Sequence, residues 1–482
     1  MAIPLLPDDP HDQKLRANLK PPGWVNPIPA PRYQLVVIGA GPAGLVAAAG
    51  AAGLGAKVAL IERDLMGGDC LNVGCVPSKT LLRAARAAAE VRRAKEFGIR
   101  VPEPEVDFAA VMERVRRVRA ELSAVDAAQR FRGLGVDVFL GEARFVNEDT
   151  VEVNGAKLRF GRCVIATGAR PVIPDIPGLK ESRWFTNETI FALTELPKRL
   201  LAIGGGPVGC ELAQAFARLG AEVTLSLHEG RLLPREEPAA ALAVRAALRA
   251  DGAELRHAPV SVADFDAVLV AAGRLPNVER LNLEAAGVQF DTKDGVRVND
   301  YLRTTNRRVF AAGDVCSLGY KFTHAADAMA RLVIRNALFP TKGKASSLVI
   351  PWCTYTEPEV GRVGLNEGEA EAKGVAVDIY RQEFAQLDRG AADGADGFVK
   401  VLTAKGTDRI VGATVVGPHA GELVGTVSLA MTHGIGLKKL ANTVFPYPTY
   451  TEALRKIADQ YNRTRLTPVA KRVLGTWLKW MR

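Results

Sequence analysis

Two cysteines separated by four residues, Cys70 and Cys75, are the side chains whose type and spacing most directly suggest chemistry. Such a pair can close a short-loop disulfide if the first helical turn is distorted, because an ideal helix holds these positions too far apart. Gly74 and Asn72 give the backbone freedom for that distortion. A helix beginning near Cys75 would direct its positive end at the sulfurs and lower their pKa. We therefore predict a redox-active pair with a thiolate at neutral pH.

Two other interpretations of the pair are a structural disulfide and part of a metal site. The sequence holds no second close cysteine pair to complete a zinc site. The remaining cysteines, Cys163, Cys210, Cys316 and Cys353, stand singly in mostly apolar segments, which is typical of a reducing compartment. No secretory signal is visible at the start of the sequence, so we expect a cytoplasmic protein.

A glycine-rich turn upstream of the cysteines begins the set of elements that must position them. The apolar run 34–38 predicts a buried parallel strand, and Gly39, Gly41 and Gly44 follow it and open an alanine-rich helix. The first glycine allows a tight turn, the second lets the backbone approach a pyrophosphate, and the third lets helix and strand pack closely. The next strand ends in Glu62, placed to accept from a ribose hydroxyl. The unit predicts a bound dinucleotide, and beside a redox pair it suggests a flavin.

The same pattern recurs later in the chain. A strand over 199–203 leads into Gly204, Gly206 and Gly209, and a helix and another strand over 222–227 follow. Two complete patterns predict two bound dinucleotides.

The second unit differs from the first at its strand end. Where the first has Glu62, the second has Leu227 followed by His228, with Arg231 and Arg235 beyond. The missing acid and the cationic groups favour a 2′-phosphate, hence NADPH over NADH. NADH remains the alternative if His228 is merely a surface residue.

Three further apolar strands, over 164–169, 268–274 and 309–314, end in small residues that permit close backbone approach to a cofactor. Asp314 could accept from a ribityl hydroxyl or cap the helix that follows it. From about residue 350 onward, alternating strands followed by helices predict an α+β module.

Length and charge limit the remaining choices. A chain of 482 residues is expected to form roughly two to four domains. The net charge is +10, but the basic residues are spread along predicted helices without interleaved aromatics or a nucleic-acid motif. We therefore expect no nucleic-acid partner, and a surface that attracts anionic nucleotides accounts for the charge.

Taken together, these residues resemble the FAD-containing pyridine nucleotide–disulfide oxidoreductases, the family of glutathione reductase, dihydrolipoyl dehydrogenase and mercuric reductase. The resemblance runs from about Tyr33 to about Asn462. Its motifs are Gly39 to Gly44 with Glu62, Gly67 to Lys79, Ala166 to Gly168, Gly204 to Glu211, Gly273 to Asn277 and Ala312 to Asp314.

The resemblance implies an α/β fold with two Rossmann-like nucleotide-binding domains, for FAD and NAD(P)H, plus a C-terminal α+β dimerisation domain that forms a homodimer. The NAD(P)H-binding domain is expected to be shortened, because fewer residues precede its last strand than the family usually has. The predicted segments are an extended N-terminal arm (1–32), the FAD-binding domain (33–178 and 297–348), the NAD(P)H-binding domain (179–296), the dimerisation domain (349–465) and a basic amphipathic tail (466–482).

The resemblance also implies a role for each site residue. Cys70 becomes the interchange thiol that attacks the substrate, and Cys75 the sulfur nearest the flavin. Lys79, one helical turn further, would approach the flavin ring and pair with Glu211. The other residues implied to bind the two cofactors are Gly39, Gly41, Gly44, Glu62, Gly68, Thr167, Gly168, Gly204, Gly206, Gly209, His228, Arg231, Gly273, Gly313 and Asp314.

One position departs from the glutathione- and lipoamide-type members, which carry a histidine, oriented by a glutamate, as acid–base catalyst for the thiol pair. Here Tyr447 stands in the place of the histidine, and Glu452 is retained. A tyrosine with a pKa near 10 is a poor proton shuttle at neutral pH. Mercuric reductases resemble this chain in having a tyrosine there.

We therefore predict that electrons pass from NADPH through FAD and the Cys70–Cys75 pair to a thiol-bound metal ion, with Hg(II) held transiently at both sulfurs. The alternative is a dihydrolipoyl-dehydrogenase-like reaction on a disulfide. A hypothesis of another class is a redox sensor or a membrane-docked electron-transfer flavoprotein. The C-terminal cysteine pair and N-terminal metal-binding domain of mercuric reductases are both missing from this sequence.

The tail places aromatic residues and leucines among basic residues at roughly helical spacing over 471–482, as in helices that lie at a membrane surface. The shortness of the segment favours packing against the dimer partner over membrane contact.

Overall fold

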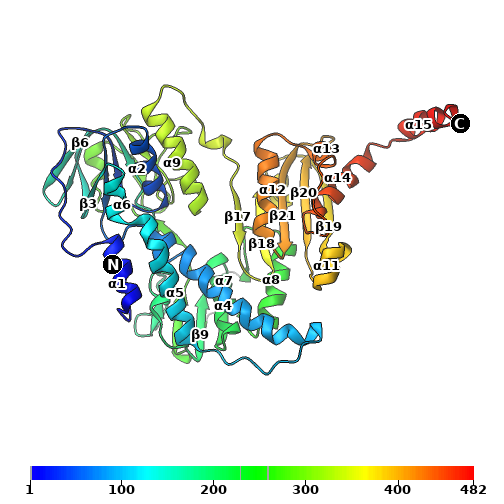
Figure 1. The fold of residues 1–482 in the computed structure, drawn as a ribbon, viewed down its shortest axis with the longest axis horizontal. Coiled ribbons are helices and arrows are strands. Elements are labelled where there is room, and N and C mark those ends of the chain that lie inside the picture. Colours follow the sequence, from blue (N-terminus) through cyan, green and yellow to red (C-terminus); the bar gives the residue numbers. More distant parts are fainter. Residues whose placement is uncertain (1–2, 228–229, 258–259) are drawn as a thin grey trace. The chain divides into compact units, whose positions relative to one another are not determined.

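The computed structural model describes residues 3–227, 230–257 and 260–482. The chain divides into two compact units, one of residues 1–231 and 251–348 and the other of residues 232–250 and 349–482 (Figure 1). Each unit has its own sheets and its own core.

The first unit is built on a sheet whose central strands are mostly buried. Strands β3, β2, β1, β6 and β16 run parallel in that order, and β4, β5 and β6 form an antiparallel meander at the other side. Leu35–Ile38 is apolar and fully buried because neighbours cover both faces of a parallel sheet. The strands are β1 (Tyr33–Ile38), β2 (Val58–Glu62), β3 (Val136–Leu140), β4 (Ala143–Asn147), β5 (Thr150–Val153), β6 (Ala156–Ile165) and β16 (Val309–Ala311).

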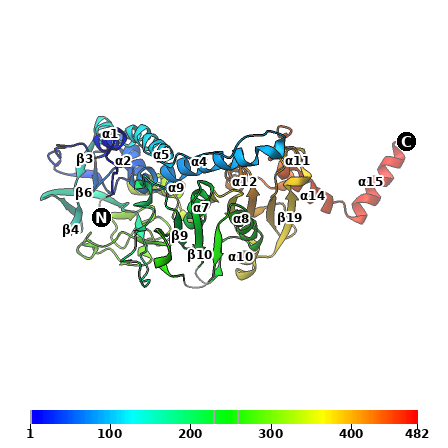
Figure 2. The same ribbon diagram turned by 90° about the horizontal axis from the view of Figure 1, so that it is seen from below.

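The two predicted redox cysteines lie on consecutive helices of this unit. The helix α4 packs against α5 and also against α7, the helix that follows the second glycine turn (Figure 2). The helices of this unit are α2 (Pro42–Gly53), α3 (Gly68–Asn72), α4 (Cys75–Arg93), α5 (Phe108–Leu122), α6 (Ala128–Gly133), α7 (Pro207–Arg218) and α9 (Thr323–Leu338).

The sequence analysis predicted an extended arm for the N-terminal segment, but part of this segment is helical. Residues Pro10–Leu19 form a helix, α1, which packs against α5. Asp9 caps the helix and Pro10 occupies its first turn, where a missing N–H costs nothing. Leu15 and Leu19 are fully buried, and the buried Asp12 pairs with Arg119 at 2.9 Å.

The second sheet of this unit is parallel throughout, in the order β11-β10-β9-β12-β8. Both of its edges are short strands, which limits pairing with another chain. The strands are β8 (Trp184–Phe185), β9 (Arg199–Ile203), β10 (Glu222–Ser226), β11 (Glu254–Arg256) and β12 (Ala267–Val270), with two separate antiparallel pairs, β7 (Ala169–Pro171) with β13 (Arg274–Pro276) and β14 (Phe290–Asp291) with β15 (Gly295–Val296).

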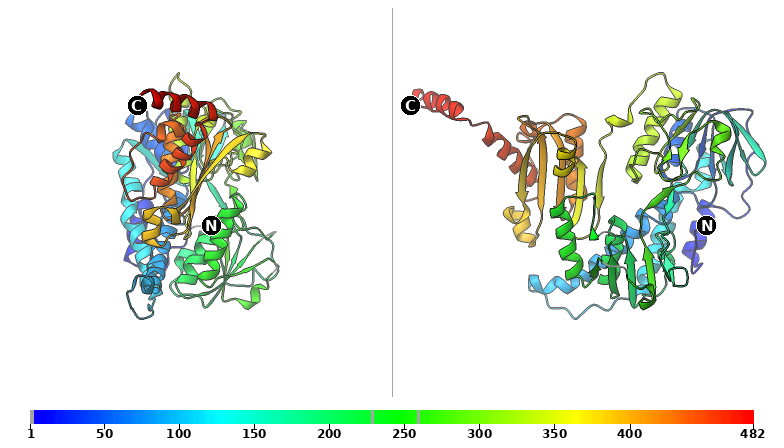
Figure 3. Two further views of the ribbon diagram at one scale, coloured as in Figure 1. Left: turned by 90° about the vertical axis from the view of Figure 1, so that its right-hand side faces the viewer. Right: turned by 180° about the vertical axis from the view of Figure 1, so that it is seen from behind.

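The second unit is an antiparallel sheet in the order β17-β18-β21-β20-β19. The helices α12 and α14 pack on this sheet (Figure 3), and the buried apolar side chains of the sheet and both helices form one core. The strands are β17 (Pro351–Thr354), β18 (Glu359–Gly364), β19 (Val377–Glu383), β20 (Phe398–Ala404) and β21 (Ile410–Gly417), and the helices are α8 (Pro238–Ala250), α10 (Glu367–Ala372), α11 (Asp388–Asp393), α12 (Ala420–Thr432), α13 (Leu437–Leu440), α14 (Glu452–Thr464) and α15 (Pro468–Trp480).

Helix α8 lies within the range predicted for the NAD(P)H-binding domain, yet it belongs to the second unit. Two buried carboxylates just before this helix explain the grouping. Glu237 lies 2.7 Å from the ammonium of Lys400, and Glu236 accepts a hydrogen bond of 2.7 Å from the indole of Trp352. Buried charges require such partners, so the sheet holds the start of α8.

Candidate active site

The cysteine pair lies at the junction of two helices. The short helix α3 ends at Asn72, Gly74 caps the next helix, and α4 begins at Cys75 as predicted. A Cβ atom on Gly74 would lie 2.8 Å from the carbonyl oxygen of Asp69, so only glycine fits there. Asn72 has helical backbone, and its role differs from the predicted one. Its buried amide donates to the carbonyls of Met66 and Gly68, at 3.0 and 2.9 Å, and fixes the loop.

The surroundings make the two sulfurs chemically unequal. Cys70 and Cys75 are not joined in a disulfide, and the hydrogen bond that Cys70 donates lowers the pKa of Cys75 to about 6. The hydroxyl of Thr323, 3.3 Å from the Cys75 sulfur, and the charge of Lys79 act in the same direction. The same hydrogen bond raises the pKa of Cys70. At neutral pH the pair is therefore one thiolate, Cys75, and one thiol, Cys70.

Lys79 and Glu211 come together from α4 and α7, although 132 positions separate them. The ammonium lies 2.7 Å from a carboxylate oxygen of Glu211, whose side chain is only 6% exposed. A carboxylate so buried needs a cation beside it. The pairing implied by the resemblance is thus present, and it holds a positive charge one helical turn from Cys75.

The two glycine turns have nearly the same geometry. Gly39 and Gly204 have φ values of +101° and +118°, a region that favours glycine. A Cβ atom on Gly44 or Gly209 would lie 1.8 or 1.9 Å from the carbonyl oxygen of the first glycine of its own turn, so helix and strand touch backbone to backbone.

The middle glycines leave room at the helix starts. A Cβ atom on Gly206 would meet nothing within 4 Å, and one on Gly41 would meet only the Cα of Gly68, at 3.7 Å. Each position faces open space beside unpaired amides of a helix N-terminus, which is the environment a pyrophosphate requires. Both turns fit a dinucleotide.

The strand ends after the two turns differ as the sequence indicated. The carboxylate of Glu62 accepts from the backbone N–H of Ala40 at 2.7 Å and of Asp64 at 2.9 Å, so it is fixed at the turn. At the equivalent place Leu227 is buried and carries no polar group. The predicted residue His228 lies outside the described residues, and Arg231 is exposed.

The other predicted cofactor-binding positions combine small size with unusual backbone. Gly68, Gly168, Gly273 and Gly313 have φ values of +58°, +67°, +119° and +82°. Thr167 donates to the carbonyl of Asn277 at 2.7 Å, which ties β6 to the segment after β13.

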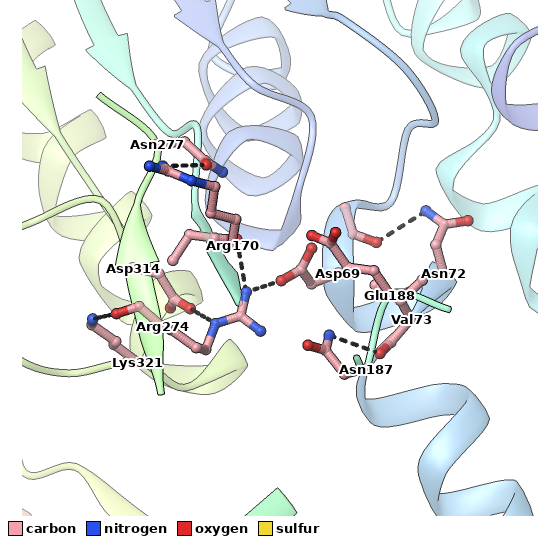
Figure 4. Close-up of polar contacts among 12 residues, drawn as sticks. Asp69, Asn72, Val73, Arg170, Asn187, Glu188, Arg274, Asn277, Asp314 and Lys321 are labelled. Carbon is pink, nitrogen blue, oxygen red and sulfur yellow. Dashed lines mark hydrogen bonds and ion pairs between the residues drawn. The ribbon is translucent and has the colours of Figure 1, made fainter. Parts of the chain in front are cut away.

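An arginine to which the sequence analysis gave no role lies between two acidic side chains (Figure 4). Arg274 pairs with Asp69, the residue before Cys70, and its Nε lies 3.6 Å from Asp314. It also donates to the carbonyl of Ala169 at 2.8 Å. Asp314 therefore faces Arg274 and does not cap α9, which starts only at Thr323. Burial raises the pKa of Asp314.

Tyr447 and Glu452 belong to the second unit. The phenol of Tyr447 is exposed and donates to Asp388, and this hydrogen bond raises its pKa above the ordinary value. One oxygen of Glu452 lies 3.5 Å from Lys456, and the other is buried without a hydrogen bond from any described residue. Glu452 does not orient Tyr447 by a hydrogen bond in the described part of the chain.

No group of three or more His, Cys, Asp or Glu side chains gathers among the described residues in a way that could hold a metal ion. None of the helices formed by these residues has both the length and the apolar character needed to cross a membrane.

Two dinucleotide turns beside an asymmetric thiol pair define a dinucleotide-dependent thiol oxidoreductase. The chain belongs to the pyridine nucleotide-disulphide oxidoreductase family, which it matches over residues 33–330, and it matches the dimerisation domain of that family over residues 350–458. The predicted family, fold class and enzyme class are confirmed. Members of the family depend on FAD and use NAD(P)H, and the dimerisation domain supports a homodimer.

Similar proteins carry more than one name. A mercuric reductase of Lysinibacillus sphaericus is 35% identical over 453 residues, covering 89% of this chain and 83% of the relative. A dihydrolipoyl dehydrogenase of Thermus scotoductus is also 35% identical, over 89% of this chain and 98% of the relative. Among solved structures, the HOCl-induced flavoprotein disulfide reductase RclA from Escherichia coli is 28% identical with a TM-score of 0.77, covering 89% of this chain and 99% of that chain. Its Cu(II) complex gives a TM-score of 0.78.

Proposed function

We propose that this enzyme uses NADPH, FAD and the Cys70–Cys75 pair to reduce a thiol-bound metal ion, with Hg(II) as the substrate. The net reaction would consume one NADPH for each metal ion and transfer two electrons. The observation that carries the proposal is the tyrosine at position 447, where the resemblance places a histidine in the disulfide-reducing members, because a phenol with a pKa near 10 is a poor proton carrier at neutral pH.

The first glycine turn, with Glu62, would hold the FAD, and the second would hold the NADPH. When bound, the flavin supplies the transfer of two electrons from NADPH to the sulfur pair. Lys79, paired with Glu211, keeps a fixed positive charge on the helix that begins at Cys75. Thr167, Gly168, Gly313 and Asp314 line the strand ends proposed to contact the flavin side. These assignments follow from the resemblance and from the geometry of the turns.

The thiol pair is suited to a soft metal ion. Cys75, with its low pKa, offers a thiolate, and Cys70 offers a second sulfur once its proton leaves. Thiolates are preferred ligands of soft metal ions. Reduction to the neutral metal would remove the positive charge that the thiolates bind, so the product would leave the pair.

The acceptor distinguishes this proposal from the related activities. Reduction of a disulfide requires a group that gives and takes protons near neutral pH. Tyr447, whose pKa is raised by its bond to Asp388, is poorly suited to that task. A metal ion held by two thiolates requires no such group, and the similarity to mercuric reductases agrees with this choice.

A dihydrolipoyl-dehydrogenase-like reaction is the second candidate. The Thermus scotoductus relative favours it, because the match covers 98% of that protein at 35% identity. In this case the proton step would be slow in the wild-type enzyme. A redox sensor, the remaining candidate, would stop after one reduction per site.

The proposal also includes NADPH as the reductant and a cytoplasmic location. NADPH is favoured because Leu227 stands where Glu62 stands in the first unit, and the cationic Arg231 and Arg235 follow it in the sequence. The location is inferred from the single cysteines, three of which are buried.

The decisive experiment compares acceptors in wild-type enzyme and in Tyr447→His and Tyr447→Phe variants. We expect steady NADPH oxidation with Hg(II) presented as its glutathione complex, and little with lipoamide. Tyr447→His should raise lipoamide turnover by about tenfold or more, since imidazole titrates near pH 6.5. Tyr447→Phe, which keeps the ring, should not.

Fast lipoamide turnover by the wild-type enzyme, without gain in Tyr447→His, would contradict this account of the tyrosine. In that case the second candidate would be correct. Replacing either Cys70 or Cys75 by serine must abolish turnover of every acceptor.

A further inference from the structure

The last helix of the chain, α15, carries an apolar surface that the rest of the described chain does not bury. It runs from Pro468 to Trp480, and Thr467 caps it by accepting from the N–H of Ala470 at 3.2 Å. No residue of this helix is buried, and Trp480, Val469 and Trp477 are 77%, 69% and 55% exposed. The family's dimerisation domain ends at residue 458, ahead of this helix.

The side chains of the helix are separated into two faces. Advancing about 100° per residue places every apolar side chain after Pro468 on one half of the circumference and every charged side chain on the other. The apolar face holds Val469, Ala470, Val473, Leu474, Trp477, Leu478, Trp480 and Met481, and the polar face holds Lys471, Arg472, Gly475, Thr476, Lys479 and Arg482.

The charge on this segment has a single sign. From Asn462 to the end of the chain there is no Asp or Glu, and all the charged side chains are Lys or Arg. Lys471 and Arg482 border one side of the apolar face, and Arg472 lies towards the other. Long basic side chains in such positions reach outward to anionic groups while their stems cover apolar surface.

We propose that α15 lies in the surface of a membrane that contains anionic lipids, with its apolar face in the acyl boundary and its basic face at the headgroups. Tryptophans next to basic residues suit that boundary, where one end is apolar and the other wet. A helix in the membrane plane does not need the length of a spanning helix. The single sign of the charge on this helix matches a uniformly anionic lipid surface. This inference does not depend on which acceptor the enzyme reduces.

The test is co-sedimentation of the full-length FAD-loaded enzyme with vesicles. One set contains phosphatidylcholine alone, and the other contains phosphatidylcholine with phosphatidylglycerol. The wild type should bind the anionic vesicles, and high salt should weaken that binding. The variant Lys471→Ser with Lys479→Ser should bind about thirtyfold more weakly, since each basic side chain near an anionic surface contributes about fivefold.

A second variant tests the apolar face. Trp477→Ser with Leu478→Ser should lose binding to the anionic vesicles and lose the blue shift of tryptophan emission on them. The matched control, Gly475→Ser with Thr476→Ser, changes the polar face without changing charge and should bind as the wild type does. NADPH oxidation in solution should be equal in all variants, which shows that they are folded.

Two results would overturn the proposal. One is equal sedimentation of the wild type and both variants with anionic vesicles. The other is dissociation of the dimer by Trp477→Ser with Leu478→Ser in sedimentation equilibrium without lipid, which would show that a second copy covers the helix.

Discussion

The acidity of Cys75 can be altered in both directions by single substitutions, and the structure predicts the sign of each. With a pKa of about 6, the residue is roughly nine-tenths thiolate at pH 7. With an ordinary cysteine pKa of about 8.5, it would be only about 3% thiolate.

Cys70→Ala removes the largest cause of the low pKa, the hydrogen bond donated to Cys75. The pKa of Cys75 should therefore rise from about 6 towards 8.5, and the fraction of Cys75 present as thiolate at pH 7 should fall by up to about thirtyfold. Lys79→Met removes a favourable charge and should raise this pKa less. Glu211→Gln removes an unfavourable charge and should lower it.

The measurement is the rate of alkylation of Cys75 by iodoacetamide as a function of pH in the reduced enzyme, followed by mass spectrometry. Cys163, Cys210 and Cys316 give no background, because they are buried and burial raises their pKa. The half-buried Cys353 is replaced by serine in every protein compared.

The directions of the shifts in the pKa of Cys75 test this reasoning. If Lys79→Met and Glu211→Gln shift the pKa of Cys75 in the same direction, or if Cys70→Ala leaves it near 6, the electrostatic reasoning is wrong.

The pH dependence of stability gives a separate check. Because folding lowers the pKa of Cys75, its contribution is complete above about pH 8.5 and is lost as the pH falls through about 6. The difference in unfolding free energy between the reduced wild type and Cys75→Ser should shrink over that window.

Two further predictions concern the nucleotide turn and the N-terminal helix. Gly209→Ala places a methyl group 1.9 Å from a carbonyl oxygen and should cost about 1–3 kcal/mol or more in a thermal melt. Gly206→Ala should fold normally, because its methyl group meets no atom within 4 Å, but should bind NAD(P)H about tenfold more weakly, because that methyl group would enter the space expected for the pyrophosphate. Unchanged melting of Gly209→Ala would contradict the close packing. Arg119→Met leaves the buried carboxylate of Asp12 unpaired and should cost about 3–5 kcal/mol in urea unfolding, whereas the double variant Asp12→Asn with Arg119→Met should cost less because neither charge is left unpaired. Equal loss in the single and the double variant would show that the unpaired charge of Asp12 is not the cause.

The fold was largely predictable because its signals are local. A strand, a turn with three glycines and a helix follow one another within about twenty residues, so the pattern alone identifies each nucleotide-binding unit. The helix α1 was missed for a different reason. Its prolines suggested extended chain, although an Asp9-Pro10 pair is a normal helix start. What holds it, the pairing of Asp12 with Arg119, joins residues 107 positions apart.

The site was predictable only where a motif marked it. The cysteine pair, Lys79 and Glu211 stand within recognisable runs, and the structure brings the last two to 2.7 Å. The contact of Arg274 with Asp69 and Asp314 was not foreseen, because nothing in local sequence says which acid a distant arginine will meet (Figure 4). The one indication in the sequence was the acidic residue Asp69 directly before Cys70, which needs a cation if it is buried.

The two nucleotide turns show how one backbone design can serve two cofactors. Their glycines have the same geometry, so the turns themselves favour any pyrophosphate equally. Discrimination must therefore come from the strand ends. At the first, Glu62 is fixed by two backbone N–H groups, and its remaining lone pairs suit ribose hydroxyls but would repel a 2′-phosphate. At the second, the buried Leu227 leaves neither attraction for a hydroxyl nor repulsion of a phosphate. We therefore expect the choice between NADPH and NADH to depend on the residues just beyond Leu227, Arg231 among them, rather than on the turn.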